Sequence, residues 1–528
     1  MALMLALMAV ARLRLLNFPL ERDEGEYAYA GQLMLQGIPP YQLAYNMKFP
    51  GTYAAYAVIM ALFGETPAGI HFGVLCLTTL SAFMLFWLGR QMLDETAGMV
   101  AATSYAVMAA SPAMLGLAGH ATHFAAFFAT AGLCVMWKIR QSAHGWAVLT
   151  AGMLFGLAIL MKQHAALIGL WAVTALAGQQ CRQARVTRGI RFQPVALLCA
   201  GLLLPLGLSC WVLWQLGVFG KFWFWTIEYA RHYESVVPLD QAPRLFWERL
   251  CRLMRHDPLL WLLAVAGLGV VWFDERSRPA RLWLLGFCLA SALTVVPGFY
   301  FRKHYFLLVL PAAALLAASA VSGTAQLRGR RMKNFRLADW PVRVYILMLL
   351  TAIAMNSGIW FMQPPEQIAR RLYGADPLPE AGVIAQYLHD QSKPDARVAV
   401  LGSEPEIYFL ARRRSATGYI YTYGLMEPQP FASRMQAEMI REIESHSPQF
   451  VVFADNPLSW SRRPDSDPKI FEWWNAYQTN YNLVGLADIL SPTQTVYALG
   501  PEWVERYGKA LRGGGLEVYQ RKTTAAGP

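Results

Sequence analysis

The residue types most able to do chemistry stand together near the N-terminus, in the run Glu21-Arg22-Asp23-Glu24-Gly25-Glu26-Tyr27. This run directly follows the first apolar stretch of the chain. Carboxylates at a membrane surface are costly unless they are solvated, paired or used. One that faces a partly dry cavity can act as a general base, and Arg22 and Glu26 could line such a cavity. The alternative is a hydrated cluster of interfacial charges.

Two basic segments further along could bind an anion. Lys48 precedes the turn-forming pair Pro50-Gly51, and a lysine fixed at such a turn can present a point charge to a phosphate. The second segment is Arg302-Lys303-His304-Tyr305, whose arginine can bind phosphate in bidentate fashion, and Lys162 could join it. The alternatives are a lysine that extends along its apolar stem to the membrane surface and anchoring aromatic residues with incidental charge.

A metal site is only weakly indicated. His120 and His123 have a spacing that allows metal binding, but the sequence offers no third ligand beside them. The alternative that the sequence favours is a satisfied or lumen-facing pair of histidines. The seven cysteines form no CxxC pair and none follows Cys288. The sequence therefore does not establish any cofactor, and a bound divalent metal ion stays an alternative.

The composition indicates a membrane protein. The 528 residues are 55% hydrophobic and 15% charged, whereas soluble domains carry about 25% charged residues. The net charge of +12 would suggest nucleic acid in a soluble chain. Here the excess Lys and Arg fall in short loops between apolar stretches, as in cytoplasmic loops of membrane proteins. We expect a lipid bilayer as partner and no nucleic acid.

About eleven stretches could cross a bilayer, since a spanning helix needs roughly 20 mainly apolar residues. They fall near 1–16, 69–89, 97–115, 120–137, 146–161, 164–180, 194–218, 258–273, 283–298, 305–323 and 342–361. The first is short for a span, so the natural start could lie upstream. It lacks a small-residue cleavage site, so we do not interpret it as a removable signal.

The distribution of basic loops predicts the orientation. The basic set comprises Arg90, Lys138, Arg140, Arg182, Arg185, Arg188, Arg191, Arg276, Arg278, Arg281, Arg328, Arg330, Arg331, Lys333 and Arg336. The positive-inside rule places these residues in the cytoplasm. Segments 17–68, 219–257, 299–304 and everything after residue 362 then face outward.

Two domains are predicted: a multispan catalytic domain over 1–362 and an extracytoplasmic α/β domain over 363–528. In the outer loop 17–68, which is rich in tyrosines such as Tyr45, we expect helices over 25–36 and from Pro50-Gly51 to Gly64, lying flat on the outer face above a cavity. Loop 219–257 contains a basic amphipathic stretch from Arg244 to Arg255 that could lie on the lipid surface or gate a lipid path.

The predicted C-terminal domain alternates strands and helices. The expected strands are 397–401, 416–421, 449–454, 482–487, 495–499 and 516–520, and the expected helices are 380–391, 405–413, 430–445 and 468–480. No glycine-rich phosphate-binding loop of the Walker or dinucleotide kind is present in the sequence.

Three motifs together resemble a known family. They are Arg22-Asp23-Glu24-Gly25-Glu26-Tyr27-Ala28-Tyr29, Lys48-Phe49-Pro50-Gly51-Thr52-Tyr53 and Arg302-Lys303-His304-Tyr305-Phe306 with Pro311. They are similar to the bacterial branch of the protein O-mannosyltransferase-like GT-C glycosyltransferases, which includes the aminoarabinose transferase-like proteins. The resemblance covers nearly the whole chain, and it implies a GT-C-like fold in the bacterial cytoplasmic (inner) membrane. It also implies a sugar donor carried on a polyprenyl phosphate and an acceptor reached on the outer face.

The resemblance also implies roles for individual residues. Asp23 resembles the first-loop aspartate that acts as base or orients the acceptor, and Glu24 resembles the second acid of the pair. Lys48 resembles the lysine that contacts the lipid phosphate, and Arg302, Lys303, His304 and Tyr305 resemble the late outer-loop set near that phosphate. Two departures matter: Met47 stands where some relatives have an acid, and His120 and His123 occupy a loop where some carry a second acid.

The expected activity is transfer of a hexose or pentose, with inversion, to a glycolipid, a polysaccharide or a protein. Asp23 would activate the acceptor while the basic residues stabilise the departing phosphate. One alternative is an oligosaccharide or polymer ligase that uses a lipid-diphosphate donor. A lipid-sugar flippase or transporter is the other, although the apolar stretches are nearly free of central acids.

Overall fold

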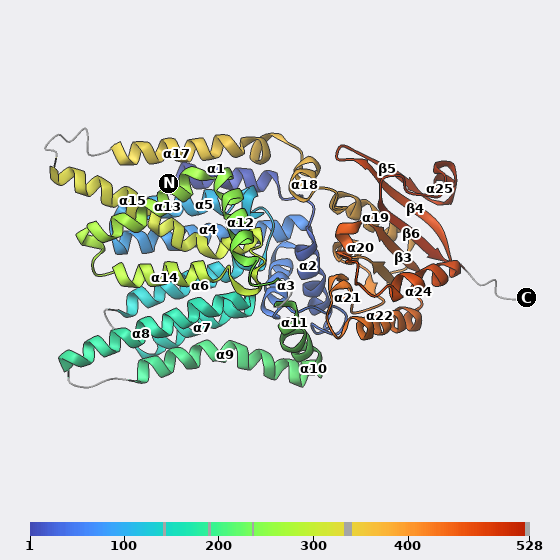
Figure 1. Cartoon of the computed structure of the whole chain (residues 1–528), viewed down its shortest axis with the longest axis horizontal. Helices are drawn as coiled ribbons and strands as arrows, with labels where there is room; N and C mark the ends of the chain where they lie inside the picture. Colours follow the sequence, from blue (N-terminus) through green and yellow to red (C-terminus); the bar gives the residue numbers. More distant parts are fainter. Residues whose placement is uncertain (141–143, 188–191, 235–236, 332–339, 523–528) are drawn as a thin grey trace, which may run out of the picture.

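The structure is a computed structural model that describes residues 1–140, 144–187, 192–234, 237–331 and 340–522. Each of the eleven predicted stretches forms a helix, and the long ones run side by side in Figure 1. They are α1 (Ala2–Arg14), α4 (Pro67–Met92), α5 (Glu95–Met108), α6 (Ala121–Ile139), α7 (Gly145–Met161), α8 (Ala166–Thr187), α9 (Gln193–Gln215), α13 (Pro258–Phe273), α14 (Arg281–Leu293), α15 (Leu310–Arg331) and α17 (Trp340–Ser357). The mainly helical architecture is therefore confirmed.

Five helical segments of the described residues are long and apolar enough to cross a membrane. They are Pro67–Met92, Ala121–Ile139, Gln193–Gln215, Lys303–Gln326 and Trp340–Met362. A sixth would be the pair α12 (Ala242–His256) and α13, which meet at a bend of 113°. The count of eleven spans stays a prediction. Of the basic loop residues that predict the orientation, Arg188, Arg191, Lys333 and Arg336 lie outside the described residues.

Small residues let neighbouring helices of this body approach closely. A Cβ atom on Gly152 of α7 would lie 2.3 Å from the carbonyl oxygen of Leu198 in α9, and one on Gly201 would lie 2.2 Å from that of Leu149. Such contacts are typical of helix packing in membranes, where dispersion contacts replace the hydrophobic effect between helices.

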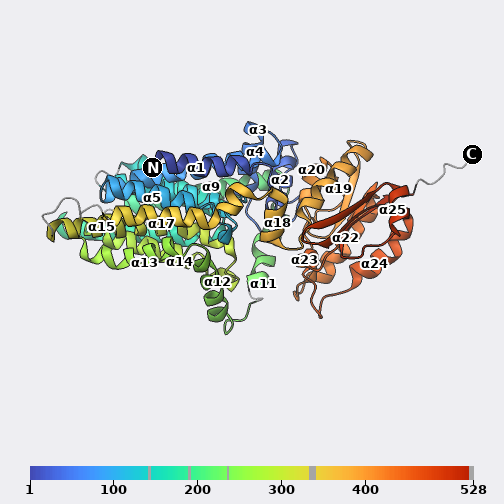
Figure 2. The same cartoon turned by 90° about the horizontal axis from the view of Figure 1, so that it is seen from above.

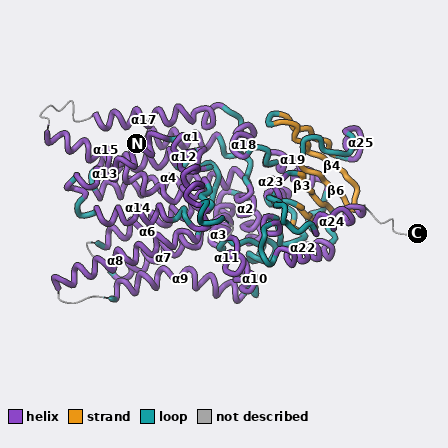
Figure 3. The backbone as a smooth tube through the Cα atoms, viewed as in Figure 1, coloured by secondary structure: helices purple, strands orange, loops and turns teal. Residues whose placement is uncertain are grey.

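The C-terminal domain contains one mixed six-stranded sheet with helices against it (Figure 3). Its order is β2-β1-β3-β6-β4-β5, with β1 parallel to β2 and β3 and the remaining pairs antiparallel. The strands are β1 (Arg397–Leu401), β2 (Arg414–Ser415), β3 (Phe450–Asp455), β4 (Tyr481–Ser491), β5 (Gln494–Leu499) and β6 (Gly515–Arg521). The helices are α19 (Leu378–Gln391), α20 (Glu406–Ala411), α21 (Tyr423–Met426), α22 (Ala432–His446), α23 (Pro457–Trp460), α24 (Lys469–Tyr477) and α25 (Pro501–Tyr507).

The predicted strand over 416–421 is wrong. Strand β2 ends at Ser415, and the following residues form a buried turn. Thr417 and Gly418 there direct their side-chain hydroxyl and backbone N–H to the carboxylate of Glu442, while the Gly418 carbonyl accepts a hydrogen bond from the Tyr45 backbone at 2.7 Å. These polar contacts satisfy the backbone in place of a strand partner.

Helices α2 (Arg22–Leu35) and α3 (Gly51–Phe63) lie between the helical body and the C-terminal domain in Figures 1 and 2. Eleven of the fourteen residues of α2 are buried, so this helix is covered by protein and is not spread on the bilayer. The sequence pattern predicts that this helix starts at residue 25, which is later than its observed start. Glu21 and Glu24 form a capping box that begins the helix at Arg22, and acids in the first turn suit its positive end.

Gly25 brings α2 against the C-terminal domain. A Cβ atom at this position would lie 2.5 Å from the backbone nitrogen of Glu406. Only glycine permits this approach, which sets the first turn of α2 against the start of α20. The short helices η3 (Phe224–Tyr229), α10 (Phe219–Trp223), α11 (Ala230–Glu234) and α18 (Pro365–Tyr373) complete the region between the two parts.

Candidate active site

A pocket of about 170 Å³ lies where the segment 17–68, the segment 297–305 and the C-terminal domain meet. Seven candidate residues from the sequence line it, namely Asp23, Tyr45, Lys48, Lys162, Arg302, His304 and Tyr305. They come from segments more than 250 residues apart in the chain. The early carboxylate and the late cationic segment therefore share one cavity.

Lys48 joins two carboxylates at the wall of this pocket. Its Nζ atom lies 2.7 Å from Asp23 Oδ1 and 2.6 Å from Glu26 Oε2. Glu26 is fully buried and also accepts hydrogen bonds from Asn46 and Tyr53 at 2.7 and 2.6 Å. The Asp23 side chain retains 19% exposure, so it is the acid of this group that faces the cavity.

The pKa values of this group follow from burial and pairing. Burial alone would raise the pKa of Asp23, but Lys48, His304 and His120 together hold it well below its usual range. Burial likewise opposes the charge on Lys48, and Asp23 and Glu26 overcome it and raise the pKa of the ammonium. Lys48 Nζ also lies over the rings of Tyr27 and Tyr421, 4.6 and 5.6 Å from their centroids. Asp23 is thus a carboxylate and Lys48 a cation near neutral pH.

The late outer loop supplies the opposite wall. Arg302, His304 and Tyr305 line the pocket, whereas Lys303 between them lines a separate cavity. The backbone is left-handed at Phe301, with φ 44°, a conformation that costs energy in a non-glycine residue. The chain therefore turns sharply just before the residues that enter the pocket.

Lys162 completes the cationic side. It stands between α7 and η2 (Gln163–Ala165), with Nζ 4.8 Å from the ring centroid of Tyr305. Burial lowers the pKa of Lys162 to about 8, although Asp23 partly counters this effect. Its charge is therefore present at neutral pH and is sensitive to moderate alkalinity.

His120 lies beside the pocket and fits a metal site better than the sequence indicated. Its ring stacks on that of His304 at 4.3 Å between centroids. Asp23, His120 and His304 each offer one ligand atom, and these atoms lie within 4.8 Å of one another. Both ring nitrogens of His120 are buried without a hydrogen-bond partner, and burial lowers its pKa to about 4, which leaves the neutral form that metals bind.

Other candidates have different surroundings. Glu24 is fully buried, and Oε1 lies 3.1 Å from His71 Nε2 and accepts the Gly119 N–H at 2.5 Å. It does not line the pocket. His123 is buried near Arg12 and also does not line it. Glu24 thus joins α2 to α4 and to the turn before α6, and the role that the resemblance implies for it stays a prediction.

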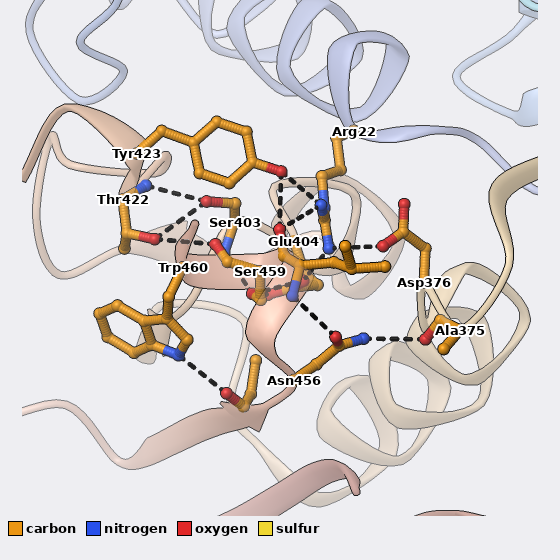
Figure 4. A network of polar contacts seen from close by, with 12 residues as sticks. Arg22, Ala375, Asp376, Ser403, Glu404, Thr422, Tyr423, Asn456, Ser459 and Trp460 are labelled. Carbon is orange, nitrogen blue, oxygen red and sulfur yellow. Dashed lines mark hydrogen bonds and ion pairs between the residues drawn. The ribbon is translucent and has the colours of Figure 1, made fainter. Parts of the chain in front are cut away.

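Arg22 is turned away from the pocket toward the C-terminal domain (Figure 4). Its guanidinium lies 3.0 Å from Asp376 Oδ1 and 3.1 Å from Glu404 Oε1, and it also donates to the hydroxyl of Tyr423 and the Leu458 carbonyl. Glu404 in turn accepts from Ser459 at 2.6 Å. We call Arg22, Asp376, Glu404 and Ser459 the docking network, since they join α2 to the C-terminal domain.

Sequence reasoning missed the aromatic wall that the C-terminal domain and η3 contribute. Tyr421, Tyr423, Trp225 and Tyr229 all line the pocket. Tyr419, Tyr421 and Tyr423 alternate with other residues, and this spacing is the available signal, although the sequence pattern predicts a strand over 416–421. Tyr45, by contrast, is where it was expected, packed against Trp225 with centroids 6.0 Å apart.

Comparison with known proteins shows that the chain is similar to lipid-linked sugar transferases. The family described as dolichyl-phosphate-mannose-protein mannosyltransferase matches residues 48–214. The undecaprenyl phosphate-alpha-4-amino-4-deoxy-L-arabinose arabinosyl transferase of Aeromonas salmonicida is 26% identical over 356 residues, which are 63% of this chain and 61% of that protein. That of Pectobacterium atrosepticum is 26% identical over 368 residues, 65% and 63% of the two chains. The matches thus span less than two thirds of the relatives' length.

Solved structures with a similar fold cover the whole chain. ArnT from Cupriavidus metallidurans in the apo state has a TM-score of 0.59 at 16% identity and covers 100% of this chain and 98% of its own. The archaeal oligosaccharyltransferase AglB from Archaeoglobus fulgidus, in complex with an inhibitory peptide and a dolichol-phosphate, has a TM-score of 0.53 at 14% identity, covering 95% and 74%. They show that the chain shares the fold of these GT-C glycosyltransferases, and the sequence matches show that it is similar to the aminoarabinose transferases.

Proposed function

We propose that this protein is a membrane glycosyltransferase that moves a sugar from a polyprenyl-phosphate donor to an acceptor on the outer face of the bacterial inner membrane. The observation that carries the proposal is the contact between Asp23 and Lys48 at the wall of a pocket that Arg302 also lines. The similar arabinosyl transferases are named for undecaprenyl phosphate, which supports the same class of donor. The acceptor is a glycolipid, a polysaccharide or a protein.

The donor phosphate would bind to the cationic side of the pocket. Lys48, Lys162 and Arg302 can together neutralise the phosphate, and the hydroxyl of Tyr305 can donate to it. When the bond from the sugar C1 to the phosphate oxygen breaks, the phosphate gains negative charge. Preformed cations stabilise this charge more in the transition state than in the bound donor, which lowers the barrier.

Asp23 would accept the proton of the acceptor. While Lys48 is bound to it, this carboxylate is a weak base, because the ammonium holds its pKa low. A donor phosphate that draws Lys48 away raises the basicity of Asp23 at the moment when both substrates are present. The acceptor hydroxyl or amine then attacks C1 from the face opposite the phosphate, its proton passes to Asp23, and the sugar configuration is inverted.

A divalent metal is compatible with this arrangement. Asp23, His120 and His304 would hold it, and the ion would supply positive charge for the phosphate when bound.

Glu26 keeps Lys48 in place whether or not Asp23 moves, because it is buried and bonded to Asn46 and Tyr53.

The membrane placement is part of the proposal. The apolar helices α4, α6, α9, α15 and α17 are of spanning length. Residue Asp23 of α2 lines the pocket, and α2 lies at the end of the helical body that faces the C-terminal domain (Figure 1). The basic loops predict that this end and residues 363–528 are extracytoplasmic. The pocket would then open at the outer boundary of the bilayer, where a lipid-linked sugar can enter from the side.

The direct test is transfer from a polyprenyl-phosphate sugar by the purified full-length protein and by Asp23→Asn. We expect transfer to fall by at least about a hundredfold. Asp390→Asn on the exposed surface of α19 is the matched control and should keep full activity. Full activity of Asp23→Asn would exclude its role as base.

A second arm separates the alternatives. A polyprenyl-diphosphate donor used in preference to the monophosphate would indicate a ligase. Movement of the donor sugar across a vesicle membrane without any acceptor would indicate a flippase.

A further inference from the structure

A second cavity, of about 300 Å³, lies outside the proposed active site. It is formed by one face of α12, the start of η6 (Lys303–Val309), the end of α18 and the short helix η1 (Pro112–Met114). Its charged and titratable lining residues are Arg249, Arg252, Arg255, His256, Lys303 and Arg371. We call it the basic cavity.

No Asp or Glu is among the described residues that line the basic cavity. The two nearest acids in the chain have partners of their own. Glu248 lies 3.0 Å from Arg244 Nε and 3.8 Å from Arg252, on the outer side of α12. Asp257 is buried and accepts hydrogen bonds from Ser111 and from Asn356, the latter at 3.1 Å.

The cations come together from different parts of the fold. Arg249, Arg252 and His256 share one face of α12 by their spacing of three and four residues. Lys303 and Arg371 are brought to the same cavity from segments about 50 and 120 residues further along. Like charges so gathered repel one another, and an anion bound among them removes that cost.

The walls of the cavity are apolar where they are not basic. Leu253, Phe306, Ile359 and Leu372 all line it. A free inorganic anion gains nothing from these side chains. A headgroup that carries a phosphate and adjoins an acyl chain would match both kinds of wall.

The position of α12 fits the surface of a membrane. It meets the apolar helix α13 at 113°, so it runs across the direction of the spans, as Figure 2 also shows. Trp247 on this helix is 65% exposed, and tryptophan favours the membrane–water boundary.

We propose that the basic cavity binds the phosphate of an anionic phospholipid from the surrounding bilayer. The bound headgroup neutralises the arginines and joins α12, α18 and Lys303. Arg302 and His304, on either side of Lys303, line the active-site pocket. The lipid therefore steadies the loop that forms the cationic wall of that pocket without itself being donor or acceptor.

The test is direct binding by the full-length protein. Native mass spectrometry in detergent, with added phosphatidylglycerol, should show a bound lipid that phosphatidylcholine does not replace. Arg255→Gln should weaken this binding by about tenfold, as expected for loss of a charge-assisted contact. Arg244→Gln, on the same helix but 85% exposed and not among the lining residues, should leave it unchanged.

Arg371→Gln checks the same site from a different helix. A similar loss is expected, and because α18 is separate from α12 the two variants do not share a folding defect. Equal losses in Arg244→Gln and Arg255→Gln would mean general attraction to a basic surface and would overturn the site. Binding of inorganic phosphate as strongly as phosphatidylglycerol would also overturn it, since the apolar walls would then play no part.

Discussion

Arg22 and Asp23 are neighbours in the first turn of α2, yet they belong to two different buried ion-pair networks. Arg22 lies in the docking network with Glu404 and Asp376, closed between α2 and the C-terminal domain. Asp23 pairs with Lys48 at the wall of an open pocket. Both networks combine basic side chains with carboxylates at similar distances.

The difference between them is access. In the docking network Arg22 is paired with Glu404 and Asp376, and none of the three lines the pocket, so the pairing holds two domains together. In the Asp23 network one side lines the pocket, so a phosphate can compete with the Asp23 carboxylate for Lys48. A buried ion pair is weak support for stability on its own account, and what it does depends on whether a ligand can compete for one partner.

Substitution of Lys48 is the strongest test of the difference between the two networks. Lys48→Met removes the cation that joins Asp23, Glu26 and the proposed donor phosphate. We expect kcat/KM to fall by about 10³-fold, since a charge placed for the leaving group is lost. Initial rates with saturating acceptor measure this loss, and Lys509→Met on the exposed surface is the control. A loss below tenfold would show that the phosphate does not depend on this lysine.

The docking network should respond in stability more than in chemistry. Arg22→Met leaves Glu404 buried without its cation, which costs about 3 kcal/mol of folding free energy. Thermal unfolding of the purified protein should shift to lower temperature, while kcat per folded molecule changes little. If kcat falls as far as in Lys48→Met with no change in unfolding, the two networks are one functional unit.

A substitution at Gly25 tests the same contact between the domains with a smaller expected effect. Gly25→Ala places a methyl group 2.5 Å from the Glu406 backbone, so α2 must shift from α20. Overpacking of this kind costs about 1–3 kcal/mol. Limited proteolysis between the helical body and residues 363–528 should become faster. Gly382→Ala on α19, where no atom lies within 4 Å of the added carbon, is the matched control.

Much of this arrangement could be predicted from the sequence because apolar stretches and turn residues are local signals. The helices of the body and five of the six strands lie close to where the patterns place them. The three motifs that resemble one family predict roles for Asp23 and Lys48 in one reaction, but they do not predict the direct contact between them. The number of spans and the roles of the site residues stay predictions.

The rest depends on geometry that the sequence does not carry. Successive residues of a helix point about 100° apart, so the acidic run alone does not say that Asp23 faces the pocket while Glu24 faces His71. In the same way, the sequence does not say that Lys303 lines another cavity while Arg302 and His304 on either side of it line the pocket. Tyr421 and Tyr423 reach the pocket only because the C-terminal domain docks on α2.

The smallest change in activity is expected at Lys162. Its pH dependence distinguishes the network that lines the pocket from the docking network, which does not. Its pKa of about 8 means that the ammonium is present below pH 8 and is lost as the pH rises through that value. The kcat/KM of the wild type for the donor should therefore decline above pH 8, because a cation near the phosphate disappears. Lys162→Gln should be about tenfold less active at pH 7 and lack this decline, whereas Lys162→Arg should keep the activity and extend the plateau to higher pH, because a guanidinium stays charged there. Arg22 lies within the docking network and should contribute no such pH dependence. An alkaline decline that persists unchanged in Lys162→Arg would assign the titration to another group and remove Lys162 from the phosphate site.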